Sequence, residues 1–212
     1  MSAPQSYYVP VDVGEAEFTE KRSRFLGHVR RVETEAEARA FLDEMRKKYY
    51  DARHNCWCYV LHEGGVVRYG DDGEPQGTAG QPMLNVLQRE GVENVVCVVT
   101  RYFGGVLLGA GGLTRAYAKS AKDALDAAGK ARMRLWSAVT VDCPYPMLER
   151  LKLLAAAHGG TVEGTDFGAA VSVRILLPQE NAAGFDAALT ELSAGTMTAR
   201  CEGERFLPGP RE

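Results

Sequence analysis

Residues 95–112 read VVCVVTRYFGGVLLGAGG, and this stretch gives the first strong indication of the fold. Val95–Thr100 is a continuous apolar run rich in β-branched residues, which is typical of a strand covered on both faces. Arg101–Gly112 then holds five glycines in twelve residues. Apolar side chains recur at helical spacing up to Ala128, with Thr114 as the expected N-cap and Gly129 at the end. The stretch therefore predicts a buried strand, a glycine-rich loop and an amphipathic helix.

The residues before this stretch predict further strands and two more helices. Thr34 and Glu37 have the spacing of a capping box, and apolar residues follow at helical intervals, which predicts a helix. Pro82 suits the first turn of a second helix, which we expect to end at Gly91. The expected extended segments are Ser23–Val32 and a hairpin of Asn55–Leu61 with Val66–Tyr69; Gly70–Gln81 is an expected loop.

The residues after Gly129 predict a second domain. Lys130–Leu135 is short, basic and without apolar periodicity, so we expect a linker there. The order that follows is strand, helix, strand, strand, helix, strand: Trp136–Asp142, Pro146–His158, Thr161–Thr165, Ala169–Leu177, Asn181–Ser193 and Thr196–Glu204. This βαββαβ order is that of ferredoxin-like domains. We expect an α+β protein of two domains, residues 1–135 and residues 136–212.

Charge and cysteine usage restrict the classes of partner and compartment. The net charge is −3, but residues up to Leu135 hold 19 Lys and Arg against 18 Asp and Glu, whereas the remainder holds 6 against 10. Because affinity for nucleic acid grows with the number of phosphates neutralised, any phosphate-binding surface should lie in the first part. Met1–Val13 carries no secretory signal pattern, no apolar run is long enough to span a bilayer, and five cysteines do not suggest a disulfide framework. We therefore expect a cytoplasmic protein that does not contact membranes.

Two polar segments are candidates for function. Asp71, Asp72 and Glu74 place three carboxylates within four residues, and Gly77 and Gly80 follow. The spacing is not that of a calcium loop, and no zinc motif is present, so we expect neither a metal nor a cofactor. A solvated turn is one interpretation of this loop, and close approach of a ligand or another element is the other.

The glycine-rich segment suits an anion better than a nucleotide. Backbone N–H groups at a helix N-terminus can face an anion, and Arg101 and Arg115 add donors suited to phosphate or carboxylate. Tyr102 and Phe103 could stack on a base or pack beneath the loop. The segment matches neither G-x-G-x-x-G nor the Walker pattern. A structural interpretation, in which the arginines pair with Asp71, Asp72 and Glu74, is equally consistent with the sequence.

The same residues resemble the signature of the IMPACT/YigZ family. The resemblance covers roughly residues 15–130 and rests on DDGEP at 71–75, GTAG at 77–80, TRYFGG at 100–105 and GGL at 111–113, with RAY at 115–117. It implies a first domain similar to the second domain of ribosomal protein S5 and a ferredoxin-like second domain, a pair similar to the last two domains of elongation factor G. The eukaryotic member restrains a translational stress-response kinase, and it does so with an additional N-terminal RWD domain. We expect no such module here, and so do not carry over its partner.

Three functions follow as hypotheses. The favoured one is a non-enzymatic protein that binds RNA or the ribosome, with a role in regulating translation, as the resemblance implies for bacterial members. One alternative is a hydrolase that uses Asp71, Asp72, Glu74 and His54. The other is a protein–protein adaptor anchored by Tyr102 and Phe103, with a translation-related protein as its partner. The candidate binding residues are Lys21, Arg24, His54, Asp71, Asp72, Glu74, Arg101, Tyr102, Phe103, Gly104, Gly105, Gly111, Gly112 and Arg115.

Overall fold

The computed structural model describes residues 7–212, and the polypeptide divides into two compact units. The first runs to Met133 and also includes Pro208–Glu212, and the second is Arg134–Leu207. Residues 1–6, part of the segment expected to lack a secretory signal, lie outside the described residues. None of the helices in the described part of the chain is both long and apolar enough to cross a bilayer.

A five-stranded sheet organises the first unit. Its order is β2–β3–β6–β4–β5, and each neighbouring pair is antiparallel. The central strand β6 is buried from Val95 to Arg101, which confirms the prediction that this apolar run is covered on both faces. The strands are β2 (Gly14–Glu20), β3 (Ser23–Arg31), β4 (His54–Leu61), β5 (Val66–Gly70) and β6 (Val95–Tyr102), with a short 3-10 turn η1 (Glu63–Gly65) between β4 and β5.

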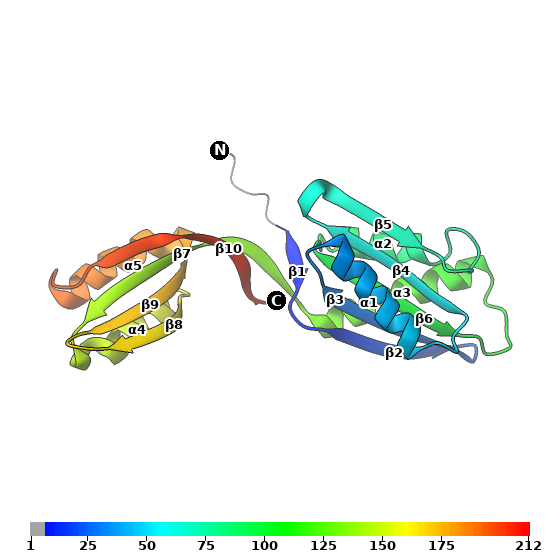
Figure 1. Cartoon of the computed structure of the whole chain (residues 1–212), viewed down its shortest axis with the longest axis horizontal. Helices are drawn as coiled ribbons and strands as arrows, with labels where there is room; N and C mark the ends of the chain where they lie inside the picture. The colour runs from blue at the N-terminus through cyan, green and yellow to red at the C-terminus, as the bar shows by residue number, and fades with distance from the viewer. Residues whose placement is uncertain (1–6) are drawn as a thin grey trace. The chain divides into compact units, whose positions relative to one another are not determined.

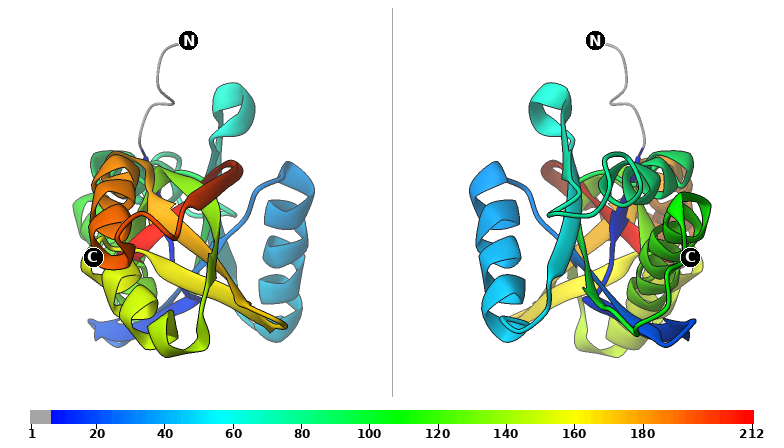
Figure 2. Two further views of the ribbon diagram at one scale, coloured as in Figure 1. Left: turned by 90° about the vertical axis from the view of Figure 1, so that its left-hand side faces the viewer. Right: turned by 90° about the vertical axis from the view of Figure 1, so that its right-hand side faces the viewer.

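Three helices cover the two faces of this sheet. Helix α1 (Glu35–Lys48) lies on one face, and α2 (Gly80–Arg89) and α3 (Ala110–Ala128) lie on the other, as Figures 1 and 2 show. The hydroxyl of Thr34 accepts a hydrogen bond from the Glu37 backbone N–H, so the predicted cap of α1 is confirmed. Both sides of β6 therefore have an apolar layer, which explains its unbroken hydrophobic sequence.

The start of α3 differs from the sequence prediction. The helix begins at Ala110, so the expected cap at Thr114 is wrong, whereas the predicted end before Gly129 is confirmed. Gly109 has φ +73°, a conformation that other residues rarely adopt, and its carbonyl accepts a hydrogen bond from the Leu113 N–H. The chain thus turns into the helix one turn earlier than the side-chain cap suggested.

The segment after α3 is a strand rather than a linker. Lys130–Leu135 forms the first part of β7 (Lys130–Cys143), and Lys130–Arg132 pairs with β1 (Tyr8–Pro10). The backbone N–H of Met133 also donates to the carbonyl of Tyr7. Residues 130–135 alternate basic and apolar side chains, a period of two that is typical of a half-buried strand and that the linker prediction overlooked.

The second unit has the predicted βαββαβ order. Its sheet runs β10–β7–β9–β8, and α4 and α5 pack on one side of it around a core that includes Leu151 and Phe185. The remaining elements are the 3-10 turn η2 (Tyr145–Met147), α4 (Leu148–Ala157), β8 (Thr161–Phe167), β9 (Val171–Pro178), α5 (Gln179–Ser193) and β10 (Ala199–Arg211). The expected two-domain α+β architecture is confirmed.

Candidate functional site

Asp71 caps the N-terminus of α2. One carboxylate oxygen accepts hydrogen bonds from the N–H groups of Ala79 (3.1 Å) and Gly80 (2.8 Å), and the other accepts from Gly77 (2.8 Å). The residue at the N-cap position, Ala79, has no side chain to do this. Asp71 therefore accepts hydrogen bonds from amides that the helix leaves unpaired, and its negative charge interacts favourably with the positive end of the helix dipole.

Asp72 fastens the same loop to β4. Its Oδ2 accepts a hydrogen bond from the Asn55 N–H at 2.7 Å, and its Oδ1 lies 3.4 Å from an Arg46 nitrogen. Its backbone carbonyl lies 2.9 Å from His54 Nδ1. His54 and Asp72 thus interact through the histidine ring and the peptide carbonyl, and not as an acid–base pair of side chains.

Glu74 and Arg101 form a buried ion pair. Arg101 Nη1 lies 2.6 Å from Glu74 Oε1, and the two residues are only 5% and 8% exposed. The Tyr117 hydroxyl donates to the same carboxylate oxygen at 2.8 Å, and Arg101 Nη2 donates to Ser23 Oγ at 3.3 Å. We call Ser23, Glu74, Arg101 and Tyr117 the buried polar cluster. It joins the loop that carries Asp71, Asp72 and Glu74, which we call the acidic loop, to the glycine-rich segment, so these two segments do face each other.

The buried groups near this cluster are held in their neutral forms. Burial raises the pKa of the Tyr117 hydroxyl, with further contributions from Cys56 and Glu74. Burial also raises the pKa of the Cys56 thiol, which donates to the Asp71 carbonyl at 2.9 Å. A thiol with a raised pKa is a poor nucleophile at neutral pH. Cys56 therefore belongs to the core rather than to a reactive site.

This geometry gives the hydrolase alternative no support. The carboxylates of Asp71, Asp72 and Glu74 accept hydrogen bonds from backbone amides, arginines or Tyr117. Nor do residues 7–212 include a group of three or more His, Cys, Asp or Glu side chains that could hold a metal ion. The acidic loop builds the fold and presents no arrangement of paired acid and base.

The glycines of the second segment have separate structural roles. A Cβ atom on Gly104 would lie 2.0 Å from the backbone carbonyl carbon of Arg22, so only glycine fits against this turn. Gly105 has φ +83°, and Gly111 and Gly112 lie in the first turn of α3. The N–H groups of that turn have no side-chain cap, which leaves them able to face an anion.

Tyr102, Arg24 and Phe103 lie at the edge of this region. The Tyr102 hydroxyl donates to Asp51 at 2.7 Å, and this hydrogen bond raises the pKa of Tyr102 to about 12. The Arg24 guanidinium pairs with Glu17 and lies over the Tyr102 ring. Phe103 is exposed, with the Arg101 guanidinium 5.5 Å from its ring centroid.

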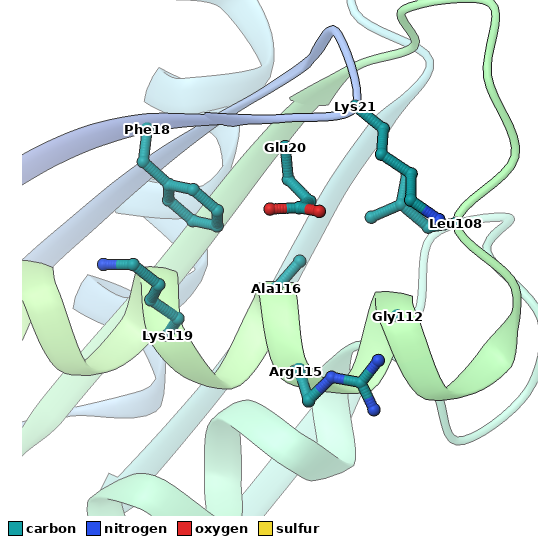
Figure 3. A pocket seen from close by; sticks show the side chains of 8 residues that line it. All are labelled: Phe18, Glu20, Lys21, Leu108, Gly112, Arg115, Ala116 and Lys119. Carbon is teal, nitrogen blue, oxygen red and sulfur yellow. The ribbon is translucent and has the colours of Figure 1, made fainter.

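A cationic hollow lies between the β2–β3 turn and the start of α3. Its volume is about 180 Å³, and Figure 3 shows the side chains of Lys21, Arg115 and Lys119 around the Glu20 carboxylate. Within the described residues, Lys21 and Arg115 form no ion pair, whereas Lys119 pairs with Asp123 and lies over the Phe18 ring. The other lining residues are Phe18, Leu108, Gly112 and Ala116.

The structure therefore separates the predicted residues into two groups. Lys21, Gly112 and Arg115 come together at the cationic hollow, while Arg101 lies in the interior with Glu74 and not on the surface. Sequence reasoning missed Phe18, Glu20 and Lys119. The i, i+4 spacing of Arg115 and Lys119 on a predicted helix was the signal that could have found Lys119.

Comparison with known proteins identifies relatives for both units. Residues 21–125 match the model of the Impact N-terminal domain, and residues 141–196 match a domain of unknown function, DUF1949. The chain is 36% identical to IMPACT family member YvyE of Bacillus subtilis, over 94% of this chain and 92% of that protein. It is also 36% identical to IMPACT family member YigZ of Escherichia coli, over 84% and 88% of the two chains. A crystal structure described as a hypothetical protein is 34% identical, with a TM-score of 0.58 over 92% of this chain and 96% of that one.

Proposed function

The chain belongs to the IMPACT family, and from this premise we propose that it is a non-enzymatic RNA-binding protein that acts on the ribosome or its RNA. The observation that carries the proposal is the cationic hollow. Three cationic side chains, those of Lys21, Arg115 and Lys119, surround one carboxylate beside the uncapped first turn of α3.

For binding RNA, the local charge of the hollow matters more than the net charge of the whole first unit. Many basic residues of the first unit are balanced by neighbouring acids, as Arg39 is by Glu35 and Lys130 by Glu90. Lys21 and Arg115 have no such partner within the described residues. Unpaired cations next to helix amides favour the binding of phosphate groups. Two or three such phosphate contacts would make the binding of RNA sensitive to salt.

The proposed link to translation comes from the family rather than from the site. Part of the chain is 40% identical to a protein IMPACT homolog of Dictyostelium discoideum, over 43% of this chain and 27% of that protein. The resemblance noted in the sequence implies a function in translation, and the ribosome is the RNA-rich partner that fits a cationic hollow. A direct measurement of ribosome binding therefore tests both parts of the proposal.

Sedimentation with ribosomes at increasing salt tests this function. We expect the wild-type chain to co-sediment at low salt and to be released as salt rises, and the Lys21→Ala/Arg115→Ala variant to bind weakly throughout. Lys47→Ala/Arg150→Ala removes the same charges at exposed positions far from the hollow in sequence, and should bind like wild type. Equal sedimentation of the three proteins would refute the proposal. Binding to ribosomal proteins that survives nuclease treatment would favour a protein adaptor instead.

A further inference from the structure

The loop between β6 and α3 exposes three large apolar side chains. Phe103, Val106 and Leu107 are 48%, 40% and 82% exposed, and they lie within five consecutive residues. Single apolar residues on a surface are ordinary, but a local group of them indicates an interaction site. We call residues 103–108 the apolar loop.

The buried polar cluster fixes the first residue of this loop. Phe103 follows β6 directly, and its ring lies over the guanidinium of Arg101. Arg101 is itself held by Glu74 and Ser23, and Ser23 Oγ accepts a hydrogen bond from the Gly104 N–H at 3.2 Å. The backbone on both sides of Phe103 is therefore held before any ligand binds, which reduces the entropy lost on binding.

The turn beside the apolar loop adopts an unfavourable conformation. Lys21 and Arg22 connect β2 to β3 and have φ +44° and +66°. Two-residue hairpin turns with positive φ at both positions favour Asn and Gly, because other side chains are strained there. Strained backbone is often found at binding sites. Here it places two cations at the tip of the hairpin.

The turn and the loop are in direct contact. Gly104 packs so closely against Arg22 that a Cβ atom would overlap the Arg22 backbone. At the other end of the loop, Leu108 lines the same hollow as Lys21 and Arg115, as Figure 3 shows. The loop that carries the exposed Phe103 is therefore in contact with the turn that carries Lys21 and Arg22, which are unpaired within residues 7–212.

We infer that the apolar loop and the Lys21–Arg22 turn together bind unpaired nucleotides of RNA. Phe103 stacks on a base, Lys21 and Arg22 contact the phosphates that flank it, and Leu107 adds apolar area at the loop tip. Aromatic platforms beside cations are the common means by which proteins hold single strands, because every base has a face that can stack. This inference rests on the proposed function and names the form of RNA that the surface takes.

Binding of a 12-nucleotide single strand that contains 2-aminopurine tests the inference. Stacking should quench the fluorescence of the probe when the full-length protein binds. Phe103→Leu should abolish the quenching and weaken binding about 5- to 100-fold, and Phe103→Trp should restore both. Leu107→Ser should weaken binding less. Phe167→Leu changes an exposed aromatic residue of the second unit and should have no effect.

A second variant separates binding from folding. Lys21→Asn/Arg22→Gly replaces two strained residues with residues that favour positive φ, so unfolding should need more urea than in wild type. The same variant should bind the single strand more weakly and with a shallower dependence on salt. A variant that is more stable and binds normally would overturn the role of this turn.

The outcomes also distinguish the inference from the proposed function. If wild type binds neither single-stranded nor duplex RNA, both fail. If it binds RNA but Phe103→Leu and Lys21→Asn/Arg22→Gly bind equally well, or if duplex RNA shows the same dependence on Phe103, only the inference fails. Binding to vesicles of anionic lipid that depends on Phe103 and Leu107, without binding to RNA, would show that the surface contacts a membrane.

Discussion

Arg101 Nη1 lies 2.6 Å from Glu74 Oε1, and neither side chain is appreciably accessible to water. The two residues come from the glycine-rich segment and the acidic loop, 27 positions apart in the chain. A buried ion pair is tolerated when further hydrogen bonds satisfy its polar atoms. Here Ser23 Oγ accepts from Arg101 Nη2 and the Tyr117 hydroxyl donates to Glu74, whereas Arg101 Nε has no hydrogen-bond partner among the described residues. The most specific sequence motifs of the chain therefore meet in its interior.

Removing one partner of this pair should destabilise the fold severely. We expect Glu74→Gln to lower the free energy of unfolding by about 3–5 kcal/mol, because Arg101 is left buried without a counter-charge. Urea denaturation of the purified variant measures the loss. Arg205→Ala breaks an ion pair with Glu163 at the surface and should cost about 0–1 kcal/mol. Equal losses in the two variants would contradict the structural importance of the buried pair.

The cap on α2 should be measurable in the same way. Asp71→Ala removes the acceptor for three backbone N–H groups and should cost about 1–2 kcal/mol of unfolding free energy. Asp71→Asn keeps one acceptor oxygen but loses the charge at the helix N-terminus, so its loss should be smaller. If Asp71→Ala and Asp71→Asn were both as stable as wild type, the role of Asp71 in capping α2 would be contradicted.

Close packing at Gly104 predicts a marked effect of one methyl group. Gly104→Ala places a Cβ atom 2.0 Å from the backbone of Arg22, which must move, so we expect a loss of about 1–3 kcal/mol. Gly168→Ala is the matched control, since its Cβ atom meets nothing closer than 3.6 Å. Thermal unfolding of both variants checks the difference. A stable Gly104→Ala variant would show that the loop and the turn can separate.

The sequence predicted those elements whose cause is local. The β-branched run of β6, the Thr34–Glu37 cap of α1 and the stop at Gly129 each depend on neighbouring residues, and each prediction is confirmed. The first part of β7 was predicted wrongly as a linker, although Lys130–Leu135 alternates basic and apolar residues as a strand does. Its pairing with Tyr8–Pro10, near the N-terminus, is not a property of the local sequence.

The candidate site shows the same limit. The sequence indicated Arg101 and Arg115 as candidate binding residues, but it left open whether they pair with the acidic loop or face an anion. The structure places them differently. Arg101 is buried beside Phe25, whereas Arg115 lies on the exposed side of α3. Which side of an element a residue takes depends on register and on the true start of α3, neither of which is a property of the local sequence.

A buried histidine makes stability depend on pH. His28 lies on β3, its ring is almost fully buried against Tyr49, and burial lowers its pKa despite Glu15 at 3.4 Å, which acts in the opposite direction. Lys48 also lowers the pKa, and Glu44 raises it. The unfolded chain takes up a proton near pH 6.5, whereas the folded chain does so only at lower pH.

Below about pH 6.5 the unfolded state therefore binds more protons, and the free energy of unfolding should fall as pH decreases toward the pKa of the folded state. One such histidine contributes a slope of at most about 1.4 kcal/mol per pH unit. His28→Gln removes this titration, so the difference in stability between wild type and variant should shrink or reverse as pH falls from 7 to 5. Urea denaturation at half-unit intervals of pH gives both curves. A difference that stays constant over that range would show that His28 takes up its proton equally readily in the folded and unfolded chains.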